Sequence, residues 1–376
     1  MKFSFSPEQE EFRRNLRRFL AEQSPPGEVR RLMETGAGWD PEAWRTQNTD
    51  LGLTALRIPE AFGGHGFGFG ELGVVMEEMG RVLLCAPYFA TAALATGAIL
   101  NAGADLDKQA LLPDVALGKT VATLAWVEDD GRWDAAATGL VARPSGGGYR
   151  LDGHKSFVLD GHTADMIVVL ARAPGSTGED GLSLFTLSGD TPGLERRPLK
   201  TMDWTRKLAR LRFDNVEAKL LGHLGGAAEP FRRTMVEAAV CLANEMVGVA
   251  DRLREDSLAY AKMRAQFGRP IASFQSMKHK CADMLLEVEL AKSAAYYAAA
   301  ALDEGDDDAT ATAHLAKACA GEAVLQTAIH AIQIHGGTGF TWDNDTHLWY
   351  KRARSSEVLL GDSSHHRDMM MRNWPG

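Results

Sequence analysis

The sequence predicts an α+β chain of several domains, with an N-terminal helical domain, a middle β-barrel or β-sandwich domain and a C-terminal four-helix bundle. Three observations predict this order: apolar residues at helical spacing over 1–118, short apolar runs between turn residues over 119–225, and long segments with few helix breakers over 226–376. Helices and strands that are segregated along a chain are typical of the α+β class rather than of an alternating βαβ fold. The 376 residues suffice for two to three domains of about 150 residues each.

Residues 1–118 are expected to form the helical domain. Ser6 and Gln9 have the spacing of a capping box, and Pro7 stands at the first position of the helix that follows. The segment Gly68–Gly73 matches the GxGxxG pattern of dinucleotide-binding turns, but Pro59 and several glycines stand where such a turn needs a strand. We therefore expect a loop between two helices at this point.

Residues 119–225 are expected to form the β-domain. Apolar runs occupy 121–127, 166–171 and 182–187, and Gly, Pro and Asp bound them. Several short strands separated by turns indicate a sandwich or a barrel. Residues 226–376 read as helical again, with long helices expected over 231–264, 273–300 and 309–335.

The composition excludes several classes of function. The net charge of −9 and the lack of a basic patch disfavour binding to nucleic acid. No run of 18 apolar residues and no signal-peptide pattern is present, so we expect neither membrane insertion nor export. The cysteines are far apart and form no CxxC pair, which indicates a reducing, cytoplasmic setting without a disulfide framework; they are Cys85, Cys241, Cys281 and Cys319.

The histidines do not predict a metal site. His365 and His366 are adjacent, and neighbouring side chains on a helix point about 100° apart, so one metal ion seldom binds both. No HExxH motif is present, and we expect no metal.

Two segments are richer in chemistry than the rest. The turn after Gln333 holds three glycines in four positions, Gly336, Gly337 and Gly339, whereas a helix C-cap needs one. The excess indicates that a ligand or another backbone approaches closely. Arg264 follows a long predicted helix, where it either stabilises the helix end or pairs with a diphosphate, and the composition does not choose between these roles.

Together these segments resemble the acyl-CoA dehydrogenase family. The likeness covers essentially the whole chain: the opening helix from Phe3 to Phe19, the loop over 51–66, and above all YAKMRAQFGRPIASFQSMKHKCADM and QIHGGTGF. The resemblance implies a flavin enzyme that forms an α,β double bond in an acyl-CoA thioester and passes the electrons to an electron-transfer flavoprotein.

The resemblance also implies which residues hold the FAD, across an interface between two subunits. One group contacts mainly the diphosphate and comprises Arg264, Phe267 and Gln275. The other lies on the adenosine side and comprises Gln333, Gly336 and Gly337. A cofactor bound at an interface implies a dimer or a dimer of dimers, with a second copy or a paralogous subunit.

The resemblance breaks at the catalytic base. Leu360 occupies the place of the family's usual acid, and leucine cannot accept a proton. Relatives that carry the base on the preceding long helix direct attention to Glu245, which has small and apolar neighbours, and then to Glu237, which lies near two arginines. Glu245 is the predicted base, the alternatives being that it is the buried partner of an arginine or that the chain has no base.

A second departure concerns the residues that face the flavin ring in the family. Residues 126–134 and 156–159 differ from the family's usual loop and strand, so contacts of these residues with the ring are in doubt. The chain is similar to a divergent branch with bulky acyl substrates, in which some members are heteromers with one competent subunit. The alternative hypothesis is therefore a non-catalytic or half-site subunit, and a flavin-dependent hydroxylase is a more remote one.

Overall fold

The computed structural model describes residues 5–374, so the first residues of the opening motif and the last two of the chain lie outside the described range. The chain divides into two compact units. The first contains the residues up to Arg31, Gly68–Leu84 and the residues from Ala239 onwards, and the second contains Leu32–Phe67 and Cys85–Ala238. The predicted N-terminal domain is thus shared between the units, and the boundaries of the three domains stay a prediction.

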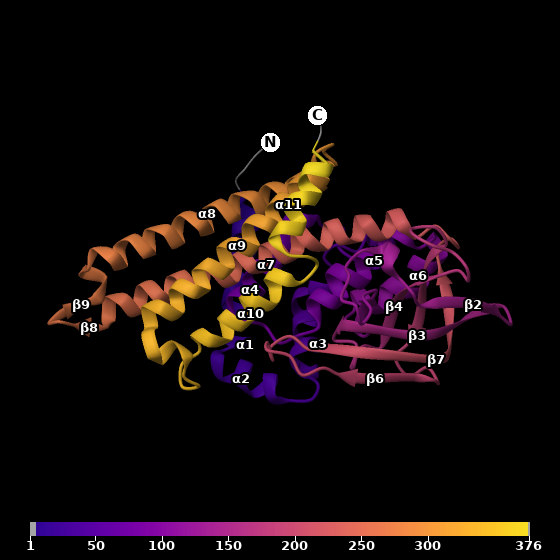
Figure 1. Ribbon diagram of the computed structural model, residues 1–376, viewed down its shortest axis with the longest axis horizontal. Helices are drawn as coiled ribbons and strands as arrows, with labels where there is room; N and C mark the ends of the chain where they lie inside the picture. The colour runs from indigo at the N-terminus through magenta and orange to yellow at the C-terminus, as the bar shows by residue number, and fades with distance from the viewer. Residues whose placement is uncertain (1–4, 375–376) are drawn as a thin grey trace. The chain divides into compact units, whose positions relative to one another are not determined.

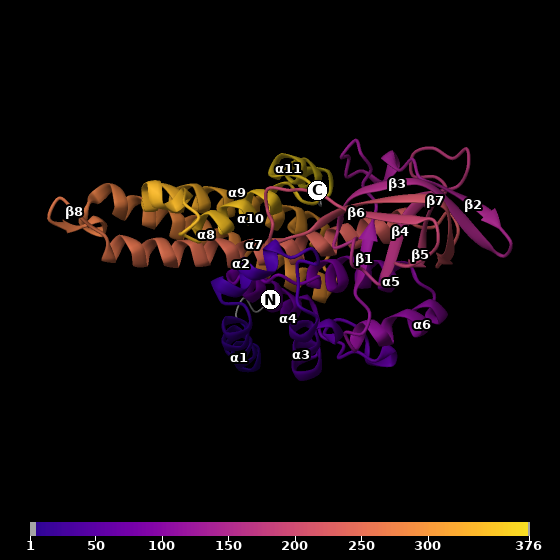
Figure 2. The ribbon, with the colours of Figure 1, turned by 90° about the horizontal axis from the view of Figure 1, so that it is seen from below.

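The first unit is helical. Its helices are α1 (Pro7–Gln23), α4 (Phe69–Arg81), α8 (Gln275–Glu304), α9 (Ala309–His335), α10 (Thr346–Val358) and α11 (Ser363–Arg372). Two further helices, α2 (Pro26–Glu34) and α7 (Ala228–Met263), run from one unit into the other. Helices α8 and α9 lie side by side in both ribbon views, and α10 and α11 pack on α9, which confirms the C-terminal helical bundle (Figures 1 and 2).

The helix starts follow from local chemistry. The Ser6 hydroxyl accepts the backbone N–H of Gln9 at 3.2 Å, and the Gln9 side chain accepts the Ser6 N–H at 2.9 Å, so the predicted capping box is confirmed. Helix α4 begins inside the GxGxxG segment, and among the described residues no strand precedes β1 at Ala122. The expected loop ends earlier than predicted, because α4 begins at Phe69 and residues 69–73 are helical.

Close packing explains the glycines of α4. A Cβ on Gly73 would lie 3.2 Å from the Asn244 side chain, and one on Gly80 would overlap the carbonyl of Glu245. On the facing helix α7, a Cβ on Gly248 would overlap the carbonyl of Glu77. At Gly80 and Gly248 the two helices therefore approach more closely than a side chain would allow.

The second unit is a β-barrel with helices. Its helical segments are α3 (Pro41–Leu51), the π-helical turn Phe89–Ala95, α5 (Thr96–Ala102) and α6 (Asp105–Ala116). Its strands are β1 (Ala122–Ala125), β2 (Val141–Ser145), β3 (Gly148–Leu159), β4 (Met166–Arg172), β5 (Leu182–Ser188), β6 (Leu194–Pro198) and β7 (Leu208–Leu221). The order β4-β2-β3-β7-β5 closes on itself because β4 also pairs with β5, while β1 pairs with β4 and β6 with β7 (Figure 2).

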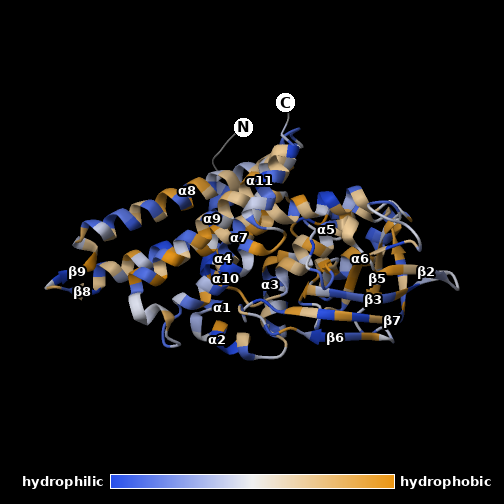
Figure 3. Cartoon of the chain, viewed as in Figure 1, coloured by the Kyte–Doolittle hydropathy of each residue, from blue (hydrophilic) through white to orange (hydrophobic). Residues whose placement is uncertain are grey.

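Alternating side chains fill the barrel. Phe185, Val169 and Leu211 are buried in one cluster contributed by β5, β4 and β7. Hydrophobic colour gathers around β5 in Figure 3. The barrel confirms one of the two predicted architectures for the middle of the chain. No helix of residues 5–374 combines the length and apolarity that a bilayer crossing requires.

Candidate functional site

A short hairpin lies between α7 and α8 and carries Phe267 at its tip, with Arg264 directly before it and Gln275 at the first position of α8. Its strands are β8 (Ala265–Gln266) and β9 (Arg269–Pro270). The Arg264 N–H donates to the Tyr260 carbonyl at 2.8 Å, and the Arg264 carbonyl accepts the Ile271 N–H at 2.8 Å. Phe267 lies at the tip with a positive φ of 53° and is 92% exposed. The Phe267 ring is therefore open to contact from outside the chain.

The second predicted segment follows α9. Gly336 has a φ of 66°, and a Cβ added to Gly336 or to Gly337 would meet no atom within 4 Å. By contrast, a Cβ on Gly339 would lie 3.1 Å from His335. The three glycines therefore have different reasons: Gly339 is needed for internal packing, and the other two leave the backbone open to an approaching group.

The two segments meet at one end of the helical unit. The Tyr260 ring stacks on the His335 imidazole with centroids 4.3 Å apart. The Lys280 ammonium, one turn beyond Gln275 on α8, donates to the Gln333 side-chain oxygen at 2.8 Å. Figure 1 shows the hairpin beside the start of α8 at this end. These contacts join neighbours of the two predicted segments at this end, and the assignment of the six residues to a cofactor site stays a prediction.

The charge of this end fits an anionic dinucleotide. In residues 5–374, no carboxylate forms an ion pair with the Arg264 guanidinium, and the Arg269 guanidinium lies over the Phe274 ring at 4.1 Å. An unpaired guanidinium is a fork that binds a diphosphate through two parallel hydrogen bonds, and open glycine backbone lets the ligand approach. These residues therefore fit FAD as their ligand. The described residues contain no group of three or more His, Cys, Asp or Glu that could hold a metal ion.

Glu245 lies in the buried middle of α7. Its Oε1 is 2.9 Å from Nη1 of Arg352 on α10, and the two side chains are 6% and 4% exposed. The sequence pattern left open whether Glu245 is a base or the buried partner of an arginine, and the structure shows such a partner. The ion pair requires an ionised carboxylate, which is also the form that a base needs, so the contact alone does not assign the role.

Glu237 is also buried and bound. Its carboxylate accepts hydrogen bonds from Arg57 at 2.7 Å, Asn101 at 2.9 Å and Arg233 at 3.1 Å. Of the two arginines next to it in the sequence, Arg233 binds it, and Arg232 pairs with other acids. Three donors leave little of this carboxylate's capacity for a substrate proton.

Ion pairs with neighbouring strands hold the divergent loop of the barrel unit, residues 126–134. Glu128 accepts the ammonium of Lys155 at 2.8 Å, and Lys155 is fully buried. Burial lowers the pKa of Lys155 to about 8, although Glu128 opposes the shift. The neighbouring Asp129 binds Arg210 and Ser156, and both contacts hold its pKa at about 2. This loop is therefore a fixed feature of the barrel.

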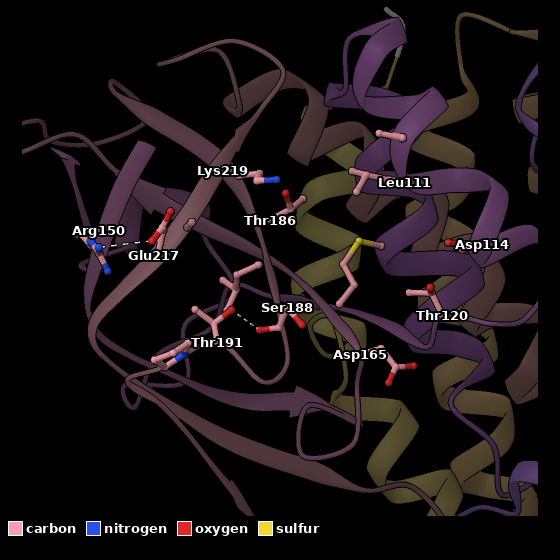
Figure 4. Close-up of a pocket in the computed structure, with 15 residues that line it drawn as sticks. Leu111, Asp114, Thr120, Arg150, Asp165, Thr186, Ser188, Thr191, Glu217 and Lys219 are labelled. Atoms are coloured by element: carbon pink, nitrogen blue, oxygen red, sulfur yellow. Dashed lines mark hydrogen bonds and ion pairs between the residues drawn. The ribbon is translucent and has the colours of Figure 1, made fainter. Parts of the chain in front are cut away.

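A pocket of about 740 Å³ lies in the barrel unit, between α6 and the strands β4, β5 and β7 (Figure 4). Asp114 and Asp165 stand on one wall, Lys219 on another, and Arg150 pairs with Glu217 at 3.4 Å at its edge. None of the predicted site residues lines this pocket.

Sequence reasoning missed a third group of residues, around Leu360. Leu360 has a positive φ of 64°, and the turn that contains it is held by Lys317 and His366. The sequence feature that could have revealed this group is Lys317, which lies in the alanine-rich segment over 309–335, where the helical period places it on the apolar face.

Comparison with known proteins gives one consistent result. Profiles described as the N-terminal, middle and C-terminal domains of acyl-CoA dehydrogenase match residues 6–119, 123–216 and 230–374. Acyl-CoA dehydrogenase IpdE2 of Mycolicibacterium smegmatis is 32% identical over 356 residues, 95% of each chain. A chain of the ChsE4-ChsE5 complex from Mycobacterium tuberculosis is 25% identical with a TM-score of 0.88, over 99% of this chain and 98% of that one. A chain of PigA with FAD and proline is 25% identical with a TM-score of 0.92, over 99% and 98%. The protein belongs to the acyl-CoA dehydrogenase family.

Proposed function

We propose that this chain takes part in the FAD-dependent α,β-dehydrogenation of an acyl-CoA thioester, with electrons passed to an electron-transfer flavoprotein. The observation that carries the proposal is the unpaired Arg264 guanidinium, together with the open backbone at Gly336 and Gly337, in a member of this family. When FAD is bound, it supplies the acceptor for the hydride from the substrate β-carbon.

The residues at the end of the helical unit bind and orient the cofactor in this proposal. Arg264 neutralises the diphosphate, and the amides of Gln275 and Gln333 donate to polar atoms of the dinucleotide. Lys280 supports the second amide, because its ammonium holds the Gln333 oxygen and so directs the NH₂ group away from itself. The exposed Phe267 ring lies against the cofactor or the second subunit.

Glu245 is the proposed base for the proton α to the thioester carbonyl. Arg352 holds the carboxylate in one orientation, and burial keeps water away from it.

A half-site subunit is the second candidate, and specific observations favour it. Leu360 cannot accept a proton, and the carboxylates of Glu245 and Glu237 both bind arginine. Helix α8 exposes Leu285, Leu286 and Leu290, as expected in either candidate of a helix that a second subunit covers. The ChsE4-ChsE5 relative is named as a complex of two proteins. In this second candidate, Arg264 and its neighbours bind a cofactor that is shared with a paralogous partner.

Absorbance spectroscopy separates the two candidates. The chain is purified alone and with a paralogous partner, its flavin band is recorded, and a panel of acyl-CoA thioesters is added. Flavin that is bound to the chain alone and bleached by a thioester supports the first candidate. Colourless protein that gains flavin only with the partner supports the second.

A variant tests the base. We expect E245Q to retain the flavin and to lose bleaching, whereas E229Q, an exposed acid at the start of the same helix, changes neither. Unchanged bleaching in E245Q removes Glu245 from the mechanism.

A further inference from the structure

Side chains from outside the turn between α10 and α11 hold that turn in place. Lys317 on α9 is fully buried, and its ammonium donates to the carbonyls of Glu357 at 3.1 Å and Gly361 at 3.0 Å. Burial lowers the pKa of Lys317 to about 8, and Glu357 and Asp362 oppose the shift. A buried ammonium needs such acceptors, because an unsatisfied one is costly.

A histidine pair completes the contacts. Nε2 of His366 lies 3.1 Å from the Leu360 carbonyl, and Nδ1 of His366 lies 2.9 Å from Nδ1 of His314. Because a carbonyl only accepts, the His366 proton is on Nε2, and its Nδ1 then accepts the N–H of His314. The carbonyls of Glu357, Leu360 and Gly361 thus each receive a donor from another element. We call Lys317, His314 and His366 the turn clamp.

The turn clamp holds a strained residue. Leu360 has a φ of 64°, a conformation that residues with a side chain rarely adopt, and Gly361 follows with a φ of 108°. Such a residue persists only where its surroundings determine it, and such residues cluster at functional sites. Leu360 is buried, so the clamp fixes the direction of an apolar side chain inside the protein.

We propose that Lys317 and the His314–His366 pair are positioning residues, which fix the turn so that the side chain at position 360 forms a rigid apolar wall that selects among acyl groups. This inference rests on the proposed function, because position 360 is where the family resemblance places a residue that faces the substrate. The clamp itself does not touch the reacting atoms.

The test compares H366L with H366Q in the flavin-loaded protein, with its partner where that is needed for colour. The glutamine NH₂ can replace Nε2–H as a donor to the Leu360 carbonyl, whereas leucine cannot. We expect backbone amides of residues 358–363 to exchange hydrogen at least tenfold faster in H366L and K317M, and within twofold of wild type in H366Q. K155M, which removes another fully buried lysine, leaves this exchange unchanged.

The second readout is the ratio of kcat/KM for butyryl-CoA to that for cyclohexanecarboxyl-CoA, which we expect to shift at least fivefold in H366L and K317M only. Equal exchange in H366L and wild type would show that there is no clamp, and equally fast exchange in H366Q would refute the assigned hydrogen bond. Faster exchange with an unchanged ratio would reduce the clamp to a structural role. If no acyl-CoA reduces the wild-type flavin, the proposed function and the selection role both fall, and the exchange data separately decide whether the clamp exists.

Discussion

Two arginines of the helical unit lie in opposite environments. Arg352 is buried, and its Nη1 donates to Oε1 of Glu245 at 2.9 Å. Arg264 lies at the exposed hairpin, where no carboxylate of the described chain pairs with it. The chain neutralises the guanidinium that it buries and leaves unneutralised the one that it exposes. The comparison teaches that the first guanidinium is committed to a partner within the chain, while the second is available to an anion from outside.

Removal of Glu245 gives the largest effect if the comparison holds. E245A leaves a guanidinium buried without its carboxylate, and we expect the free energy of unfolding to fall by about 3–5 kcal/mol. Urea denaturation measures the change. The double variant E245L/R352M should recover most of the loss, because it removes both charges. A loss below about 1 kcal/mol in E245A would mean that the pair is not truly buried in solution.

The pH dependence of stability extends the comparison to two histidines, His314 and His366, which the folded chain keeps neutral. Burial lowers the pKa of His314 to about 4, and burial with Lys317 nearby lowers that of His366 to about 2. Below pH 6.5 these two histidines bind more protons in the unfolded chain than in the folded one. Their contribution to the free energy of unfolding is therefore fully present above pH 6.5 and is lost as the pH falls. From pH 7 to pH 5 we expect a loss of up to about 2 kcal/mol for each histidine.

Urea denaturation at the two pH values measures this loss, with H314Q/H366Q as the control. Burial also lowers the pKa of His162, His330 and His347, which give a common background in both proteins. An equal pH dependence in the wild type and the control would show that the histidine pair is protonated without cost.

Substitution of Arg264 sharpens the comparison from the exposed side. We expect R264A to change the free energy of unfolding of the apoprotein by less than about 0.5 kcal/mol. FAD binding should weaken about 10–100-fold, because a hydrogen bond to a charged group contributes about 1.5–3 kcal/mol. Flavin titration measures the affinity, and R264K should lie between, since it keeps the charge but loses the fork. Unchanged affinity in R264A would remove this residue from the cofactor site.

Local patterns were enough to predict the parts of the fold that depend on neighbours in sequence. The capping box at Ser6 needs only residues three positions apart, and the order of helices, strands and helices follows from periodicity. The glycines of α4 were not explained by this reasoning: Gly80 is unfavourable in an isolated helix, but the approach of the Glu245 carbonyl requires it.

The site was predictable where sequence motifs carry it and not where distant residues meet. The open glycines after Gln333 were visible as an excess over what a helix cap needs. The partner of Glu245 was not, because Arg352 is 107 residues away and only the packing of α10 on the bundle brings the two together. The environment of Lys317 is likewise set by carbonyls of a turn 40 and 44 residues further along the chain.

The exposed ring of Phe267 has a practical consequence for production of this protein. A solvent-exposed aromatic ring at the tip of a hairpin promotes self-association of the protein when no other surface covers it. If a second subunit covers this ring as proposed, a cell that makes the chain in excess over that subunit would accumulate molecules that associate through the ring. Co-expression with the proposed subunit is therefore the starting point for purification.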